Sequence, residues 1–298
     1  MKRKNKFNAG FKLFLFCLVI LIHSSANFAF AQLFKGPISS GLGGAGVAST
    51  EVAETSFLNP ATLAHAPTFV AGIFYQDGWL EGVMHDTELA INLVDNSEGV
   101  IFPGALGFVQ KRTTYPGADP VDKRIWQLAL GNFVVPMFSA GLSFNFMEYE
   151  ASGDSYTQFN MTAGILWNPH PDWGFGLVVY HLLPRDEEIP LYFRDLQQAT
   201  AGITYIASEF LRLRLDVSKT LEMNPQKKLQ VKGGMETFIT KFFVLRLGWR
   251  NDQLNKNDSL TLGFSFVGPR FSIDYAYQKS QEEQEKGALH SVDFRIPF

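Results

Sequence analysis

The stretch that decides the fold is FLRLRLDVSK, residues 210–219. Its leucines and valine, at positions 211, 213, 215 and 217, alternate with Arg212, Arg214, Asp216 and Ser218. A period of two residues is typical of a β-strand that separates two unlike environments, because successive side chains point to opposite faces. One face of this strand is continuously apolar and the other is charged.

The same alternation recurs towards the end of the chain, at residues 260–266, 271–277 and 292–298. Each segment is about ten residues long, the length that a tilted strand needs to cross the hydrocarbon of a bilayer. The high content of phenylalanine, 28 residues, and a mean hydropathy near zero fit a barrel in lipid better than a solvated protein. The sequence therefore predicts an all-β, transmembrane antiparallel β-barrel.

The lengths of the connections predict the strand number. Counted back from Phe298, long polar connections such as DGWLEGVMHD (77–86), TTYPGADPVD (113–122) and EYEASGD (148–154) alternate with tight ones, the last of which is VDNSEGV (94–100). Bacterial barrels have short periplasmic turns and longer external loops. Seven long and six short connections predict about 14 strands over residues 67–298, with both termini in the periplasm, and the weak second and third strands leave 12 open.

The N-terminus predicts export. Five basic residues precede the apolar run FLFCLVILI, and Ala29-Phe30-Ala31 matches a signal-peptidase site, so residues 1–31 are predicted to be a signal peptide. Its removal takes away the single cysteine, Cys17, and five of the 26 Lys and Arg residues, while all 29 Asp and Glu residues remain. The resulting charge of 21 minus 29, or −8, disfavours a nucleic-acid partner.

The segment GLGGAGVASTEVAETSFLNPATLAH, residues 41–65, contains the spacing G-x-G-x-x-G at Gly41, Gly43 and Gly46. A dinucleotide-binding loop needs a preceding strand and a following helix within a βαβ unit, and here a leader precedes and a barrel follows. A disordered tail is disfavoured by the apolar FLNPATLA. No cofactor is expected.

This segment resembles the N-terminus of the FadL-type outer-membrane channels for long-chain fatty acids and other hydrophobic compounds. Those proteins begin with a glycine-rich stretch and an Asn-Pro-Ala motif, here Asn59-Pro60-Ala61. The resemblance implies that residues 32–66 form a hatch in the periplasmic mouth of a barrel formed by residues 67–298. It also implies passive uptake of hydrophobic compounds, gated by the hatch, and the hatch residues it indicates are Gly41, Gly43, Gly44, Gly46, Asn59, Pro60 and Ala61. The chain is short for this family, and its shorter PorV-like branch, which serves protein secretion or surface-protein attachment, fits the size as well; a closed structural barrel is the third alternative.

The charged face of the strands predicts the contents of the lumen. Six cations and four anions are expected there: Arg212, Arg214, Asp216, Lys228, Lys232, Glu236, Arg246, Asp274, Asp293 and Arg295. They could form ion pairs that fill and rigidify the interior, since lone charges in a narrow lumen are costly. Alternatively, Lys228, Lys232 and Arg246 could bind a fatty-acid carboxylate. The residues alone do not separate the two readings.

Two further features concern the wall. Pro103-Gly104 lacks a ladder donor and weakens a strand, so it could break the wall locally, or it could simply end a turn. In FadL-type channels a kink in the third strand opens a lateral portal, which is the role the resemblance implies for this pair. The terminal Phe298, on an alternating strand, is similar to the signal read by the outer-membrane assembly machinery.

Enzymatic function is not expected. The histidines after the leader lie in no catalytic motif, and no paired metal-ligand spacing is present. The expected partners are outer-membrane lipid, a hydrophobic small molecule, the assembly machinery and, in the alternative reading, a secreted or surface protein. The expected location is the Gram-negative outer membrane.

Overall fold

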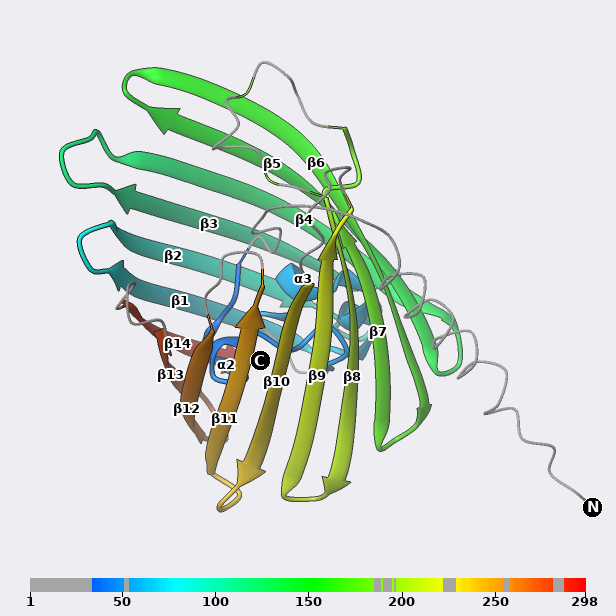
Figure 1. Cartoon of the computed structure of the whole chain (residues 1–298). Coiled ribbons are helices and arrows are strands. Elements are labelled where there is room, and N and C mark those ends of the chain that lie inside the picture. Colours follow the sequence, from blue (N-terminus) through cyan, green and yellow to red (C-terminus); the bar gives the residue numbers. More distant parts are fainter. Residues whose placement is uncertain are drawn as a thin grey trace, which may run out of the picture.

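The computed structural model is a single closed β-barrel with the N-terminal segment inside it (Figure 1). The structure describes residues 34–50, 54–184, 189, 195, 197–221, 229–253, 258–280 and 287–298. The described residues form fourteen strands, each hydrogen-bonded to its neighbours in sequence, and β1 closes the barrel by pairing with β14. This confirms the predicted antiparallel barrel and selects 14 strands over 12.

The strands are β1 (Phe69–Leu80), β2 (Met84–Asp95), β3 (Gly104–Thr114), β4 (Val121–Val135), β5 (Phe138–Ala151), β6 (Asp154–His170), β7 (Trp173–Tyr180), β8 (Gln198–Ser208), β9 (Leu211–Thr220), β10 (Leu229–Phe238), β11 (Phe243–Asp252), β12 (Ser259–Val267), β13 (Ser272–Ser280) and β14 (Gly287–Pro297). Three short helices precede them: α2 (Pro37–Ser40), α3 (Thr55–Leu58) and the 3-10 helix η1 (Pro60–His65). Among the described residues, no helix is long and apolar enough to cross a membrane.

The wall has an apolar outer face and a mostly polar inner face. On β9, Leu213 and Leu215 are 40% and 46% exposed, whereas Arg214 and Asp216 are 5% and 1% exposed. Large exposed apolar side chains on most of the strands, such as Trp126 on β4 and Leu262 on β12, would face water in a soluble protein. A lipid bilayer satisfies such a surface.

The two ends of the barrel differ. We call the end where β1 begins and β14 ends the terminal end, and the opposite end the far end. The rings of Phe69 and Phe298 lie 5.5 Å apart at the terminal end. At the far end the hairpins β3–β4 and β5–β6 extend beyond the strands β8–β11 (Figure 1).

The predicted alternation of long and short connections was wrong at three places. Residues 148–154, taken as a long loop, continue the antiparallel ladder, and β5 and β6 are joined by two residues, Ser152 and Gly153. Residues 77–86 likewise extend β1 and β2 around a turn of three residues. The β2–β3 connection, expected to be tight, spans residues 96–103. Polar strand extensions and loops have similar composition, so composition alone did not separate them.

The lipid-facing register can be tested by a charge placed on the outside of β12. We expect Leu262→Arg to lower the free energy of unfolding by about 2–4 kcal/mol, because a guanidinium at the depth of the bilayer core is poorly solvated. The measurement is urea unfolding of the barrel folded into phospholipid vesicles. The control is Thr157→Arg on the β6 extension, which should be nearly neutral. Equal small effects at both positions would contradict the lipid-facing assignment.

Candidate functional site

The N-terminal segment, described at residues 34–50 and 54–66, packs against the inner wall along a belt of glycines. At each of these positions a methyl group added to the glycine would come within 3.2 Å of an atom of the segment. At Gly164 on β6, for example, the added carbon would lie 2.0 Å from Asn59 Oδ1, and at Gly234 on β10 it would lie 2.7 Å from Leu42. The belt spans nine of the ten strands from β3 to β12, all but β9, and consists of Gly107, Gly131, Gly141, Gly164, Gly174, Gly176, Gly202, Gly234, Gly248 and Gly263. The segment therefore fits the lumen only because these side chains are absent.

Asn59 joins two parts of the segment to the wall. Its amide nitrogen donates to the carbonyl of Val47 at 2.7 Å and to that of Ile165 on β6 at 3.2 Å, and its Oδ1 accepts from the backbone N–H of Ala61 at 3.0 Å. The residue is fully buried and extended, as expected before a proline. Pro60 begins η1 and lies against Gly131 and Gly141, and Ser139 Oγ on β5 donates to the carbonyl of Ala61 at 2.8 Å. The Asn-Pro-Ala motif is thus a seat of the segment on β4, β5 and β6.

The glycine-rich stretch has a second seat on β9. The backbone N–H groups of Gly46 and Val47 donate to Asp216 Oδ2 at 2.8 and 3.1 Å. Gly43 has a φ of 71°, a left-handed conformation that favours glycine, and an added carbon there would lie 2.3 Å from the carbonyl oxygen of Trp249. Gly41 packs on Gly263 of β12.

The predicted lumen charges form a chain of contacts near the terminal end. Glu236 on β10 accepts from Arg212 at 3.3 Å and Arg214 at 3.5 Å on β9, and from Arg246 on β11 at 2.6 Å. The chain continues from Arg246 to Asp274 at 3.1 Å, from Asp274 to Arg295, and from Arg295 to Asp293 at 3.3 Å. All these side chains come from β9 to β14, so one wall of the lumen is charged.

The predicted carboxylate-binding group of Lys228, Lys232 and Arg246 does not come together in the structure. Lys228 lies outside the described residues. Lys232 pairs in register with Arg250, four residues along β11 from Arg246, which corresponds to about 13 Å along the strand. Lys232 instead lies beside Gly44 together with Lys35 of the segment. Burial, followed by the charges of Lys232 and Arg250, lowers the pKa of Lys35 well below its usual value.

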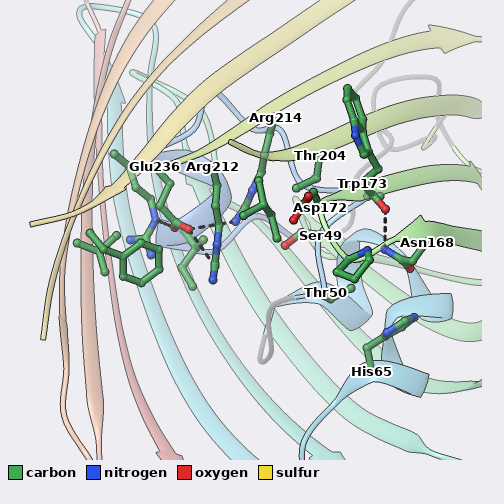
Figure 2. A pocket seen from close by; sticks show the side chains of 18 of the residues that line it. Ser49, Thr50, His65, Asn168, Asp172, Trp173, Thr204, Arg212, Arg214 and Glu236 are labelled. Atoms are coloured by element: carbon green, nitrogen blue, oxygen red, sulfur yellow. Dashed lines mark hydrogen bonds and ion pairs between the residues drawn. The ribbon is translucent and has the colours of Figure 1, made fainter. Parts of the chain in front are cut away.

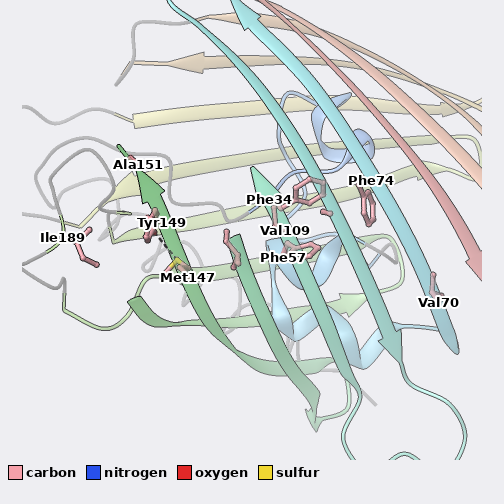
Figure 3. Packing of buried hydrophobic residues seen from close by; sticks show 11 residues of the cluster. Phe34, Phe57, Val70, Phe74, Val109, Met147, Tyr149, Ala151 and Ile189 are labelled. Carbon is pink, nitrogen blue, oxygen red and sulfur yellow. Dashed lines mark hydrogen bonds between the residues drawn. The ribbon is translucent and has the colours of Figure 1, made fainter. Parts of the chain in front are cut away.

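The opposite wall carries an apolar row (Figure 3). Five directly paired positions cross β1 to β5: Phe74, Ala90, Val109, Ile125 and Met147. All are at most 2% exposed and belong to one packed cluster that also contains Phe34 and Phe57 of the N-terminal segment. The three phenylalanine rings meet edge to face, with Phe34 5.3 Å from both Phe57 and Phe74.

This cluster reaches the far end through Tyr149, Ala151 and Ile189, the last from the β7–β8 connection. The same connection supplies Asp195, which accepts from Lys123 at 2.6 Å and from the Tyr149 hydroxyl at 2.8 Å. Asp195 therefore holds the β7–β8 connection inside the far end of the barrel. Apolar contacts continue from Ile189 in the same connection to Phe34 and Phe57 of the segment.

Pro103 and Gly104 lie at the start of β3. Gly104 is in register with Asp95 on β2 and Leu130 on β4, and neither ladder shifts register in β3. Register shifts occur instead between β4 and β5, β6 and β7, and β8 and β9. The wall is continuous at Pro103 and Gly104. A lateral portal at this pair therefore stays a prediction.

Several features of the site were not predicted from the sequence. The glycine belt, the apolar row and Lys35 were missed, although the inward register of the glycines within alternating strands was a visible signal. No group of three or more metal-ligating side chains occurs among the described residues.

Comparison with known proteins places the fold. No family model and no curated protein matches the sequence. Among solved structures, the chain is similar to the CymD monoaromatic hydrocarbon channel, with a TM-score of 0.71, 17% identity and coverage of 91% of this chain and 99% of that one. It shares the fold of hydrophobic-compound channels.

Two further structures agree. The Ralstonia pickettii toluene transporter TbuX has a TM-score of 0.69 at 13% identity, with 91% of this chain and 100% of that one covered. A Pseudomonas aeruginosa FadL homologue has a TM-score of 0.67 at 14% identity, with 91% and 99% covered. Two of the three neighbours are named as a channel and a transporter, and the FadL-type resemblance of the N-terminal segment thus extends to the whole fold.

The seat of the segment can be tested at two adjacent glycines. Gly234→Ala should loosen the segment, because the new methyl group would overlap Leu42, whereas Gly233→Ala has only ordinary contacts, with its nearest neighbour at 3.7 Å. We expect faster hydrogen exchange of the backbone amides of residues 41–48 in Gly234→Ala alone, with strand amides unchanged in both. Equal exchange in the two variants would contradict the close packing.

The carboxyl of Glu54 predicts a pH dependence. Burial raises its pKa from 4.5 to about 7, while the backbone N–H of Ser39, which it accepts at 2.6 Å, and nearby Arg295 oppose the shift. Between these two values the folded state binds more protons than the unfolded state, so stability falls as the pH rises from 4.5 to about 7, and then stays level. The total is of order 3 kcal/mol. Urea unfolding should show a larger fall in the native chain than in Glu54→Gln, because only the native chain has this carboxyl, and a fall of the same size in both would assign it to another group.

Proposed function

We propose that the chain is a channel of the Gram-negative outer membrane for passive uptake of hydrophobic small molecules, with residues 32–66 as its hatch. The observation that carries the proposal is the continuous apolar cluster from Ile189 and Tyr149 at the far end to Phe34 and Phe57 on the N-terminal segment. A hydrophobic molecule entering from outside would exchange contacts with these side chains and would meet the hatch at Phe57.

The hatch must move for passage. The apolar cluster is at most 8% exposed, and the segment fills the lumen beside it. The segment is held at Asn59 and Asp216 by a few hydrogen bonds and by backbone packing on glycine. Each hydrogen bond contributes about 1 kcal/mol, so the segment can be released one contact at a time without an energy source. Passage would continue inward past the hatch or sideways through the wall, where Pro103-Gly104 is the candidate portal.

The substrate class includes long-chain fatty acids. Phe34 belongs to the apolar cluster, and the next residue, Lys35, lies with Lys232 and Arg250 in a basic group. An amphiphile with its chain along the apolar row would have its carboxylate within reach of these basic side chains, and the carboxylate would favour the charged form of Lys35. The structural neighbours whose names give monoaromatic hydrocarbons or toluene as cargo support the broader class of hydrophobic compounds.

The proposal also covers the orientation, export and assembly of the channel. Both termini would lie in the periplasm, and residues 1–31 would be removed on export. Phe298, 70% exposed and packed on Phe69, would be read by the assembly machinery during insertion. The protein-secretion alternative, and a permanently closed barrel, remain as outcomes of the test.

Uptake assays with three variants test the proposal. Gram-negative cells without other hydrophobic-compound channels would express the chain and be given radiolabelled oleate or ethylbenzene. Met147→Gln should reduce uptake of both, because it places an amide in the apolar row. Lys35→Gln should reduce oleate uptake by about tenfold and leave ethylbenzene unchanged, since only the carboxylate uses that charge. Gln127→Asn, on the inner face of β4 outside the row, is the control.

Three results would contradict the proposal or favour one of its alternatives. Native-chain uptake no greater than in cells without the chain would contradict a conduit. A stoichiometric protein partner in mild-detergent extracts, with no hydrophobic ligand, would favour the secretion role. If residues 41–61 are deleted and the barrel remains impermeable to small solutes, the closed structural barrel is favoured.

A further inference from the structure

A cavity of about 510 Å³ opens at the terminal end, beside the N-terminal segment (Figure 2). Ile38, Ala48, Ser49 and Thr50 of the segment line one side, and inward side chains from β6 to β14 line the other. The segment contributes these four residues to the cavity and Phe34 and Phe57 to the apolar cluster, and the cavity and the cluster share no described residue. The volume of the cavity is in the range of small-molecule binding sites.

Most of the charges that line the cavity belong to the chain of ion pairs. Four arginines and two acids face it: Arg212, Arg214, Arg246, Arg295, Glu236 and Asp172. Burial lowers the pKa of the lining His65, so its imidazole is neutral at neutral pH. Glu236 is shared by three of the arginines, and Asp274 and Asp293, which are not among the lining residues, pair with Arg246 and Arg295. Asp172 lies at the β6–β7 turn, 3.2 Å from His170.

The cavity offers both solvent access and apolar wall. The side chain of Arg212 is 31% exposed, in contrast to 2% for Arg214 and 4% for Arg246. Its guanidinium lies 4.7 Å from the centre of the Phe238 ring, which fixes its plane. Ile206, Val244 and Val267 complete an apolar surface beside it.

We propose that this cavity is a second binding site, for a compact organic carboxylate with an apolar body. A carboxylate accepts two parallel hydrogen bonds from a guanidinium, and a partly desolvated cavity strengthens that pair. The site stands apart from the lumen cluster because the two share no described residue, and it does not depend on the proposed uptake function. If the conduit operates, an acid that passes the hatch meets this site next.

The probe is 4-fluorobenzoate, observed by fluorine NMR with the full-length mature barrel in detergent. A nitroxide label at Glu209→Cys, in the β8–β9 turn beside the cavity, should broaden the bound signal. The same label at Asp154→Cys, at the far end, should not, which separates the cavity from partition into the micelle. The neutral 4-fluorobenzyl alcohol should show no such contrast.

Arg212 supplies the decisive variants. Arg212→Gln should weaken binding of 4-fluorobenzoate at least about tenfold, and Arg212→Lys, which keeps the charge but loses the paired donors, should weaken it less. Arg124→Gln, on the outside of β4, should bind as the native chain does. Equal broadening from both labels, no broadening at all, or full binding in Arg212→Gln with native strand content would each overturn the site while leaving the uptake proposal to its own assay.

Discussion

The close packing of the N-terminal segment on inward-facing glycines is the contact on which the rest of the structure depends. Ten strand positions lack a side chain where the segment passes, and the gaps are filled by the segment's own backbone and by Asn59 and Leu42. Without the segment these positions would leave a hollow lined with backbone. With it, the lumen is divided into a far compartment and a terminal one.

The divided lumen is also two-sided. Strands β1 to β5 present the apolar row, whereas β9 to β14 present ion pairs linked through Glu236 and Asp274. The rows meet at the closure of the barrel, where Phe74 on β1 is in register with Asp293 on β14. A hydrophobic molecule therefore has one wall to follow, and the charged wall holds the segment through Asp216. The Oδ2 atom of Asp216 accepts both hydrogen bonds from the segment's backbone, so this contact can form and break without another side chain.

Much of the barrel could be predicted from the sequence, because strand alternation is a local signal. Residues 210–219 alone indicate which side chains of β9 face the lumen and which face outwards. The number of strands follows from the spacing of the turns. Hairpin extensions could not be predicted, since a polar residue at the end of β5 satisfies its backbone equally well as strand or loop. The site was partly predictable: the charged residues were found, but their partners depend on register between strands. The separation of Lys232 from Arg246 and the closeness of Lys35 follow from how the segment is seated, and that depends on contacts between residues far apart in sequence.

The most direct test of the account is whether the segment must leave its seat for a hydrophobic molecule to pass. Ser56 of α3 and Asn92 of β2 are joined by a 2.9 Å hydrogen bond, so cysteines at both positions can be bridged by a short, reducible thiol crosslinker. Uptake of a radiolabelled hydrophobic compound is then measured in cells before and after reduction, with each single cysteine as control. The account predicts that uptake stops in the bridged double variant and returns on reduction. Uptake that is unchanged by the bridge would contradict the role of the segment as a hatch.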